Sequence, residues 1–294
     1  MGEHSLSALI GRFADEGLTE TPLDGLRLLR LSQPVGPQHA TIEPSICGVV
    51  QGKKRVHLGG DSYDYDATHY LCATMPIPLE GEVVEASLNR PVLGFLLSID
   101  TTTMTETVLA MEAQATMQLS AEVVPGLSVA EWDTAVIVAL QRVLELLDDP
   151  VALRVLGKGR MKELMFAFLR GGAGAAIRQA LGATRDVSRA VSYLQEHLAE
   201  SVSIEDLAKR AGMSRAVFHK KFKAATSYSP IQFVKGLRLN HASMLIAAGS
   251  SVTDAAHQVG YASQSQFSRE FRRQFGRTPG QWRRASGDEI RAVG

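Results

Sequence analysis

The sequence predicts an α+β protein with two domains, in which a small antiparallel β-barrel or sandwich with added helices precedes an all-α domain. Three observations support this fold class. Short, evenly spaced strand-like runs fill residues 24–100, helical periodicity prevails from about residue 101, and one stretch of the C-terminal third is written twice. At 294 residues the chain is long enough for two separate hydrophobic cores, which we place at residues 1–183 and 184–294.

The barrel segment follows a short helix predicted over Leu6–Glu16. Its strand-like runs are bounded by Gly, Pro or Asp, as strands commonly are. They cover Leu26–Leu31, Ser45–Gln51, Lys53–Leu58, Tyr63–Tyr65, His69–Met75, Glu82–Leu88 and Val92–Ile99. We expect a turn through Pro34–Pro37, a hairpin that joins the second and third runs at Gly52, and another turn at Gly59–Asp61.

Helical periodicity then extends over residues 101–182. The predicted helices cover Thr101–Leu119, Trp132–Leu147, Val151–Leu156, Met161–Leu169 and Ala173–Leu181. The helix Trp132–Leu147 carries a broad apolar stripe, for which two interpretations are open. The stripe packs against the barrel of its own chain, or it forms a dimer interface that doubles the number of binding units in the assembly.

The C-terminal domain is built on a duplication. The stretch Ser203–Phe233 recurs as Ser251–Trp282, with Ser, Asp, Ala and Gly at matching positions and Phe, Phe, Pro and Gln in the same order afterwards. Two copies are too few for a solenoid and indicate a duplicated supersecondary unit. Between the copies, Ile231–Ala247 is predicted to form one long helix.

Each copy has the parts of a helix-turn-helix, which we place at residues 203–223 and 251–275. A serine caps the first helix, and a glycine that can adopt a positive φ ends it. In the first copy these residues are Ser203 and Gly212, and Ser214 caps the next helix. The inward residues are predicted to be Val217, Phe218 and Phe222 in the first copy and Phe267, Phe271 and Phe275 in the second.

The outward faces of the two second helices carry side chains suited to reading DNA. Arg and Lys suit guanine edges and phosphates, and Gln suits adenine. The candidate DNA-binding residues are Ser214, Arg215, Ala216, His219, Lys220 and Lys223 in the first copy, and Gln264, Ser265, Gln266, Ser268, Arg269, Arg272 and Arg273 in the second. The helix between the copies would hold the reading helices about 34 Å apart, so that both enter successive major grooves. The alternative is an ordinary helical domain with solvated basic faces.

The charge distribution favours a polyanion as the partner of the C-terminal domain. From Thr184 onward the chain has 17 Lys and Arg and 9 Asp and Glu, although the whole chain has 31 of each. The C-terminal domain is therefore basic and the preceding part acidic. This asymmetry indicates that the C-terminal domain alone binds nucleic acid.

The second copy contains a distinctive set of short motifs. They are Ala255-Ala256, Val259-Gly260-Tyr261, Ser265-Gln266-Phe267-Ser268-Arg269, Phe271-Arg272, Phe275-Gly276 and Thr278-Pro279. This pattern resembles the C-terminal DNA-binding domain of the AraC/XylS family of bacterial transcription regulators. The resemblance implies base reading by Ala216, His219 and Lys220 in the first unit and by Ser265, Gln266 and Arg269 in the second. Family members often have a larger or polar residue at the site of Ala216, so we expect weak base reading there.

A weaker resemblance covers the N-terminal domain. The runs His69-Tyr70-Leu71, Met75–Leu79 and Val92-Leu93-Gly94 are similar to the N-terminal domain of one AraC subgroup, a cupin-like small β-barrel followed by helices. This resemblance implies effector binding or dimerisation without identifying a ligand. We therefore expect a homodimeric regulator that binds double-stranded promoter DNA and responds to a small effector, with RNA polymerase as a further candidate partner. A regulator without any ligand is the alternative.

An enzyme is an alternative from another class, because many cupins hold a metal. The histidines His39, His57 and His69 are widely spaced without a His-x-His pair, so the sequence predicts no metal ligands, cofactor or catalytic residues. The enzyme alternative is a cupin-type metalloenzyme domain fused to a DNA-binding module. The run Lys53-Lys54-Arg55 would neutralise an anionic effector or form a solvated hairpin.

The remaining sequence features concern the cellular compartment. Cys47 and Cys72 lie in apolar stretches and indicate small core residues, with a thiol sensor as the alternative. The start MGEHSLSALI lacks the pattern of a signal peptide, and no apolar run approaches the ~20 residues that span a bilayer. We expect a soluble, cytoplasmic protein.

Overall fold

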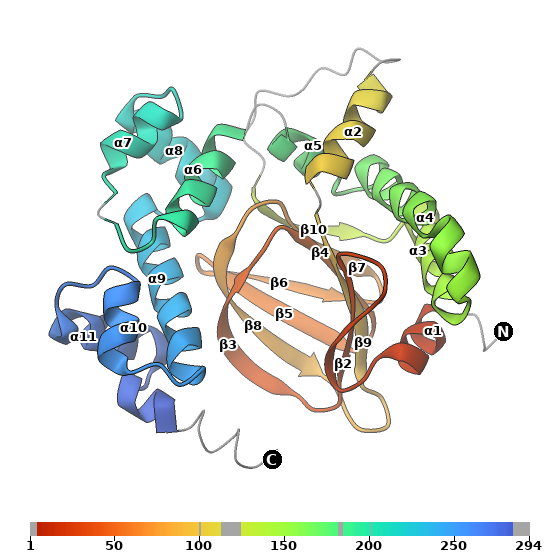
Figure 1. Cartoon of the computed structure of the whole chain (residues 1–294), viewed down its shortest axis with the longest axis horizontal. Helices are drawn as coiled ribbons and strands as arrows, with labels where there is room; N and C mark the ends of the chain where they lie inside the picture. The colour runs from red at the N-terminus through yellow and green to blue at the C-terminus, as the bar shows by residue number, and fades with distance from the viewer. Residues whose placement is uncertain (1–4, 100, 113–124, 182–184, 201, 285–294) are drawn as a thin grey trace. The chain divides into compact units, whose positions relative to one another are not determined.

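The computed structural model describes residues 5–99, 101–112, 125–181, 185–200 and 202–284. It has two compact units, residues 1–38 with 42–185 and residues 39–41 with 186–294 (Figure 1). The first unit holds a curled antiparallel sheet with helices and the second is helical, so the predicted α+β class is confirmed. No helix in the described ranges is both long and apolar enough to cross a lipid bilayer.

A single sheet of the described residues dominates the first unit. Its strands are β1 (Gly17–Glu20), β2 (Leu26–Leu31), β3 (Val35–Ile42), β4 (Ser45–Gln51), β5 (Lys53–Leu58), β6 (Asp61–Asp66), β7 (His69–Ala73), β8 (Ile77–Glu85), β9 (Val92–Ser98) and β10 (Leu127–Glu131). Their order is β1-β2-β9-β4-β7-β6-β5-β8-β3, with β10 paired to β7 beside this path. Along this spatial order, every pair of neighbouring strands from β1 to β8, including those with β9, is antiparallel.

The helices of the first unit follow the sheet, except for one at its start. They are α1 (Leu6–Phe13), α2 (Thr101–Glu112), α3 (Thr134–Glu145), α4 (Pro150–Arg170) and α5 (Gly174–Leu181), with a 3-10 turn at Leu146–Asp148. The predicted helix Thr101–Leu119 lies outside the described residues beyond position 112. The two short helices predicted over Val151–Leu156 and Met161–Leu169 are wrong as separate elements, because α4 is continuous. Its Gly157 is buried and faces Leu23, so tertiary packing explains a glycine inside the helix.

One face of the sheet is apolar and packs against helices. Leu28 on β2 lies opposite Phe95 on β9, and Ile46 on β4 lies opposite Leu97. All four side chains are buried in one core that includes residues of α1, α3 and α4. Because side chains alternate along a strand, this register commits the same face of three strands to the core.

The apolar stripe of α3 packs within its own chain. Val136, Leu140, Val143 and Leu144 are each 0% exposed and belong to the core of the first unit. Their placement confirms packing against the chain's own sheet, and the interpretation of these four residues as a dimer interface is wrong. The stripe was ambiguous because helical periodicity identifies a buried face and does not identify what covers it.

Several strand predictions need correction. The hairpin at Gly52 is wrong, because β4 pairs with β7 and β9 while β5 pairs with β6 and β8. Gly52 has a φ of 80° and lies close to the carbonyl of Glu85, so it turns the chain between two parts of the sheet. The turn over Pro34–Pro37 is also wrong, since the edge strand β3 begins at Val35, and an edge tolerates proline. The short strands β1 and β10 were not predicted, and β10 lies in the segment expected to be helical.

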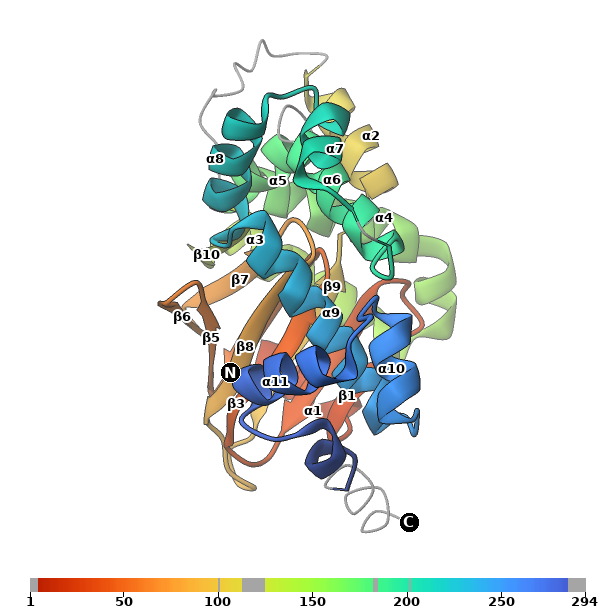
Figure 2. The same ribbon diagram turned by 90° about the vertical axis from the view of Figure 1, so that its left-hand side faces the viewer.

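The second unit contains helices joined by short turns. They are α6 (Arg185–Glu196), α7 (Ile204–Arg210), α8 (Arg215–Thr226), α9 (Pro230–Ala247), α10 (Val252–Gln258) and α11 (Gln264–Phe275). The pairs α7–α8 and α10–α11 are the two predicted helix-turn-helix units, and α9 is the predicted long helix between them (Figure 2). Helix α6 was not predicted.

The turns follow the chemistry predicted for them. The hydroxyl oxygens of Ser203, Ser214 and Ser251 each accept a hydrogen bond from a backbone N–H of the first helical turn. Gly212 and Gly260 have φ values of 64° and 84°, which only glycine adopts readily. The duplicated sequence therefore encodes the duplicated structure through its caps and turns.

Candidate nucleic-acid interface

Aromatic side chains anchor both second helices, α8 and α11. In the first helix-turn-helix unit, the ring of Phe222 lies 5.4 Å from that of Phe218 and 5.2 Å from that of Phe233 on α9. In the second, Phe271 lies 5.4 Å from Phe267 and 4.3 Å from Phe275. This packing fixes the rotation of each helix about its axis, and therefore selects the residues that face outward.

The prediction that Val217 points inward is wrong, because its side chain is 45% exposed. The buried positions of α8 are Phe218, Phe222, Ala225 and Thr226, which follow the i, i+4, i+7, i+8 pattern of a single stripe. Val217 lies at the margin of that stripe, about 100° around the helix from Phe218.

The candidate residues of the first helix-turn-helix unit form one exposed surface on α8. Arg215, Ala216, His219, Lys220 and Lys223 are all exposed and recur at helical spacing along the same side. The guanidinium of Arg215 forms a 2.7 Å ion pair with the exposed carboxylate of Glu205. The Ser214 hydroxyl caps α8, so it is engaged at the beginning of the helix.

The candidate residues of the second helix-turn-helix unit form a second exposed surface, on α11. Arg269, Arg272 and Arg273 are exposed and form no ion pair with another residue of the described part of the chain. Gln264, Ser265 and Gln266 are also exposed, whereas Ser268 is half-buried. The Gln264 amide donates to the Thr253 hydroxyl at 3.2 Å, and the Gln266 amide donates to the Glu270 carboxylate at 3.3 Å.

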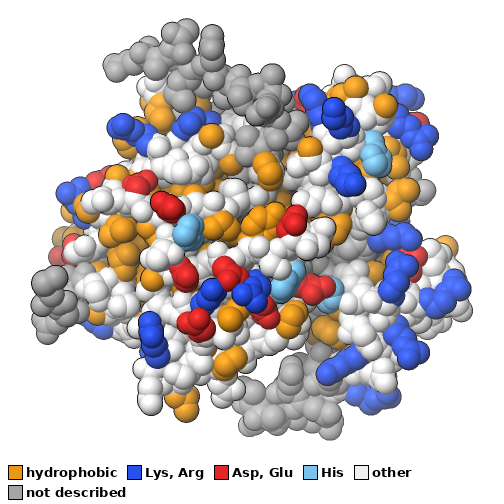
Figure 3. Space-filling view, turned by 180° about the vertical axis from the view of Figure 1, so that it is seen from behind, with side chains coloured by type: hydrophobic (Ala, Val, Ile, Leu, Met, Phe, Trp, Pro, Cys, Tyr) orange, Lys and Arg blue, Asp and Glu red, His pale blue; other side chains and the backbone are white. Residues whose placement is uncertain are grey.

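Lys and Arg gather over the visible face of the second unit (Figure 3). Such a concentration of cations attracts a polyanion. When the polyanion binds, it releases its condensed counter-ions, and this release makes the affinity depend on salt concentration. Both surfaces carry cations of the kind that suit phosphates. The α8 surface adds the imidazole of His219, and the α11 surface adds amide and hydroxyl groups, which are suited to base edges.

Glu270 is a positioning residue of α11 that the sequence pattern did not reveal. Its carboxylate accepts hydrogen bonds from the Lys235 ammonium at 2.9 Å and from the Tyr261 hydroxyl at 2.8 Å. Burial acts to raise the pKa of Glu270, but the hydrogen bonds from Lys235, Tyr261 and Gln266 outweigh it and lower that pKa. The charged carboxylate thereby ties α11 to α9. Lys235 and Glu270 are 35 positions apart in the sequence, so their contact leaves no local signal.

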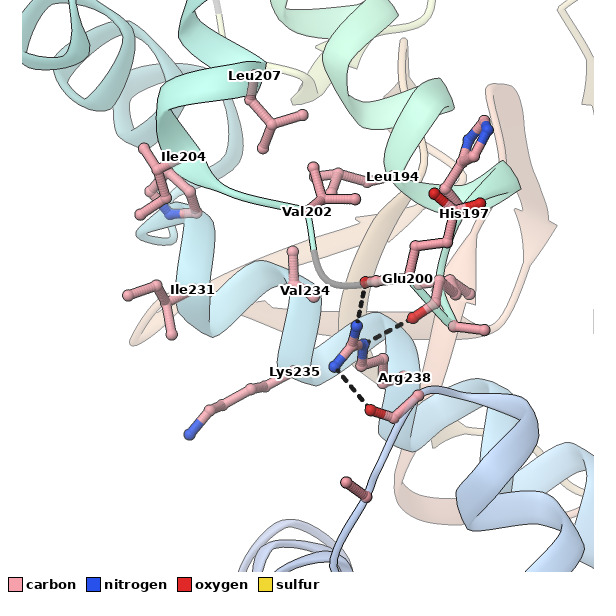
Figure 4. Close-up of a pocket in the computed structure, with 15 residues that line it drawn as sticks. Leu194, His197, Glu200, Val202, Ile204, Leu207, Ile231, Val234, Lys235 and Arg238 are labelled. Atoms are coloured by element: carbon pink, nitrogen blue, oxygen red, sulfur yellow. Dashed lines mark hydrogen bonds between the residues drawn. The ribbon is translucent and has the colours of Figure 1, made fainter.

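Arg238 on α9 is a second residue of this kind (Figure 4). Its guanidinium donates to the carbonyls of Leu198 and Glu200, each at 2.8 Å, and to that of Gly260 at 3.4 Å. The first two carbonyls precede the first helix-turn-helix unit, and the third lies in the turn of the second. Arg238 therefore connects the segment that precedes the first helix-turn-helix unit with the turn of the second, through neutral backbone groups.

The first unit contains candidate effector-binding features. Lys53 and Arg55 are paired with acidic side chains, since both bind Asp64 and Arg55 also lies 3.2 Å from the Glu82 carboxylate. Lys54 alternates to the other side of β5, where its ammonium lies 5.9 Å from the centre of the Tyr65 ring. Burial lowers the pKa of Lys54. Lys54 is thus a half-buried cation beside an aromatic ring, and the role of this run in binding an anionic effector stays a prediction.

A groove of about 970 Å³ lies elsewhere in the first unit, between α2, α4 and the ends of β2 and β9. Leu153, Met161 and Met165 contribute apolar surface to it, and Arg154 and Lys158 contribute exposed cations. Its volume is that of pockets that hold small molecules.

His57 and His69 have hydrogen-bond partners, and both cysteines are buried. The His57 ring bonds the Ser62 hydroxyl at 2.8 Å and the Glu82 carboxylate at 3.2 Å, and the His69 ring bonds the Thr68 hydroxyl. Among the described residues, no three His, Cys, Asp or Glu side chains come together as a metal site. Cys47 and Cys72 are buried free thiols, which confirms them as core residues. Burial raises the pKa of both thiols, that of Cys72 to about 12.

Comparison with protein families gives two matches. The family model described as the AraC-type transcriptional regulator N-terminus matches residues 22–176, more than half of the chain. A helix-turn-helix domain model matches residues 207–285.

Individual relatives match in the C-terminal region. The transcriptional activator RhaS of Escherichia fergusonii is 37% identical over 90 residues, which cover 30% of this chain and 32% of RhaS. The regulatory protein SoxS of Escherichia coli K12 is 33% identical over 94 residues, which cover 32% of this chain and 88% of SoxS. Relatives such as RhaS are thus matched over about a third of their length.

One solved structure shares the fold of most of the chain. Unsaturated fatty acid bound ToxT from Vibrio cholerae is similar over 88% of this chain and 93% of its own, with a TM-score of 0.56. The sequence identity is 14%, so this similarity concerns the fold alone.

Proposed function

Because the chain belongs to the AraC-type transcriptional regulators, we propose that it binds double-stranded promoter DNA through α8 and α11, placed in successive major grooves. The observation that carries this proposal is the pair of exposed basic surfaces on two matched helix-turn-helix units. The 18-residue helix α9 has a length of about 27 Å, which suits a spacer between neighbouring grooves.

Within this proposal the candidate residues have different tasks. Arg269 and Gln266 read base edges on α11, and His219 and Lys220 do so on α8. Ser265 and Ala216 make smaller contacts at the same two base-reading surfaces. The remaining residues bind phosphates or position the helices, which fixes the register on the duplex. They are Ser214, Arg215, Lys223, Gln264, Ser268, Arg272 and Arg273.

The first unit is proposed to bind a small effector and to pair two chains. Lys54, a desolvated cation beside Tyr65, supports an effector with an anionic group. The structure of ToxT, which shares the fold, contains an unsaturated fatty acid, which is also an anionic ligand. Thermal unfolding of the full chain against a panel of metabolites tests effector control, because a ligand at a hundred times its Kd adds ~2.7 kcal/mol of stability. An unchanged transition with every compound would instead support a regulator without a ligand.

We propose that the protein acts by binding, in the cytoplasm where the promoter lies, and has no catalytic activity. A bound effector would favour one arrangement of the two units over another and so change which half-sites or polymerase contacts are available. Membership of a regulator family supports this mechanism over the metalloenzyme alternative.

The DNA-binding proposal is tested by selecting duplexes from a random pool with the full chain and measuring the affinity of variants. We expect Arg269→Ala to cost ~1–3 kcal/mol on the selected duplex and to relax the preference at one base pair. Lys223→Ala should weaken binding to selected and random duplexes equally, and should reduce the salt slope by about one unit. Lys158→Ala, an exposed lysine of the first unit, is the charge-matched control and should change neither. Equal losses on both duplexes for Arg269→Ala would refute base reading by Arg269.

A further inference from the structure

A pocket of about 420 Å³ lies within the second unit, where α6, α7 and α9 meet the turn of the second helix-turn-helix (Figure 4). None of the thirteen candidate DNA-binding residues lines it. Its function is therefore not explained by contact with DNA.

Most of the wall is apolar and comes from three helices and the segment before α7. The apolar side chains are Leu194, Val202, Ile204, Leu207, Ile231 and Val234. Leu194 and Leu207 are buried and form a floor, whereas Ile231 is 56% exposed and lies at the opening. Such a wall suits a hydrocarbon body of modest size, because the volume falls at the lower end of the range for small-molecule sites.

The polar part of the wall holds two cations, Arg238 and Lys235, together with Glu200 and His197. Arg238 is half-buried, and its three hydrogen bonds within the described residues all go to neutral carbonyls. A guanidinium has five N–H donors, so two remain beyond these bonds. Lys235 also lies on the wall, one helical turn before Arg238, and its ammonium forms an ion pair with the carboxylate of Glu270 on α11.

Arg238 forms no ion pair with another described residue, and the Glu270 carboxylate acts on it through space without bonding it. A half-buried guanidinium without a directly bonded carboxylate is an unusual arrangement, because desolvation of a charge is costly unless an opposite charge compensates it. Burial lowers the pKa of Arg238, which reflects this cost. An anion beside Arg238 would add a directly bonded counter-charge and accept hydrogen bonds from its remaining donors. A single guanidinium next to an apolar wall matches a monoanion with a hydrocarbon body better than a multiply charged phosphate.

We propose that this pocket binds a small carboxylic acid, with its carboxylate beside Arg238 and its apolar body against Leu194, Val234 and Ile231. The ligand would contact the guanidinium that connects the segment before the first helix-turn-helix unit with the turn of the second. This site is separate from the groove and from Lys54 in the first unit.

The test is calorimetric titration of the full chain with octanoate in the absence of DNA. We expect saturable binding of octanoate, binding of octan-1-ol weaker by about tenfold or more, which is ~1.4 kcal/mol, and no binding of octylamine. Because the assay contains no DNA, it is independent of the proposed DNA-binding function. Equal affinities for octanoate and octan-1-ol, or no saturable binding, would overturn the proposal.

A pair of variants locates the site. Ile231→Glu places a negative charge at the opening and should weaken octanoate binding at least about tenfold, whereas Ile231→Lys should not weaken it. Ile231 is exposed in the first turn of α9, where glutamate is well tolerated, so both variants are expected to fold. Arg154→Glu, in the groove of the first unit, is the matched control and should leave the affinity unchanged. Loss of affinity in Arg154→Glu with none in Ile231→Glu would place the ligand in the first unit and refute the site.

Discussion

At the scale of single residues, Gly260 has two separate requirements for glycine. Its φ is 84°, and a Cβ at this position would lie 2.6 Å from the carbonyl oxygen of Ala199. Gly276, which ends α11, has a φ of 68° but has open space where a Cβ would be. A substitution at Gly276 therefore introduces backbone strain alone, whereas one at Gly260 introduces backbone strain and steric overlap together.

Gly260→Ala should destabilise the second unit by ~2–5 kcal/mol, because a left-handed backbone conformation and a close backbone contact both oppose a methyl group. Gly276→Ala should cost only ~1 kcal/mol, since strain acts there alone. Hydrogen exchange of backbone amides in residues 251–284 measures both effects in the full chain. An equal loss of protection in the two variants would show that the approach to Ala199 contributes nothing.

Residue exposure in the candidate interface was largely predictable from helical spacing. The exposed positions of α8 and α11 follow directly from the buried Phe218, Phe222, Phe267 and Phe271. The tasks of Glu270 and Arg238 were not predictable, because their partners, apart from Gln266 on α11 itself, lie 9 to 40 residues away. Val217, at the margin of a stripe, shows where periodicity alone becomes ambiguous.

At the scale of elements, Asp64 connects neighbouring strands of the sheet. It lies on β6 opposite Arg55 of β5, and its carboxylate also lies 2.7 Å from the Lys53 ammonium. Hydrogen bonds from Arg55 oppose the effect of burial, and with those from Lys53 they lower the pKa of Asp64 to about 2. A lowered pKa means that the folded state favours the charged carboxylate. The stabilisation is therefore present above the ordinary pKa of about 3.9 and is lost as the pH falls towards 2.

We expect Asp64→Asn to lower the thermal unfolding temperature of the protein near neutral pH, and we expect this difference from the wild type to shrink between about pH 4 and pH 2. Asp61→Asn, at the exposed start of the same strand, is the control and should have little effect. Unfolding followed by circular dichroism over this pH range provides the measurement. A difference between Asp64→Asn and the wild type that stays constant with pH would contradict the role assigned to the charge.

The strands also show how far an element is encoded locally. The bounds of β2, β4 and β5 match the predicted runs Leu26–Leu31, Ser45–Gln51 and Lys53–Leu58, because apolar alternation and flanking turn residues are local features. Which strands pair was not encoded in this way. The separation of β4 from β5 at Gly52 depends on partners elsewhere in the chain.

At the scale of the whole molecule, exposed apolar residues of α4 suit the proposed pairing of two chains. Val151 and Val155 are 65% and 74% exposed and lie one turn apart on the same side of the helix. Phe166, further along that side, is 40% exposed. Exposed apolar groups of this kind, clustered on one helix, mark interaction surfaces.

We expect the wild type to sediment as a dimer at micromolar concentrations and the double variant Val151→Lys with Val155→Lys to sediment as a monomer, because two buried lysines would be costly in a dimer interface. Sedimentation velocity over a range of concentrations measures this. Leu88→Lys, which changes a 76% exposed leucine outside α4, should remain dimeric. A monomeric wild type, or a dimeric double variant, would exclude this surface as the interface.

The sequence by itself determined the α+β class, the two helix-turn-helix units and the outward surfaces of α8 and α11. These features depend on caps, positive-φ glycines and apolar spacing, which act over a few residues. The tertiary structure alone decided the strand order, the burial of the α3 stripe against its own sheet, and the contacts of Glu270 and Arg238. These features bring together residues distant in the chain, and their free energy depends on which surfaces meet in the folded protein, which no local pattern specifies.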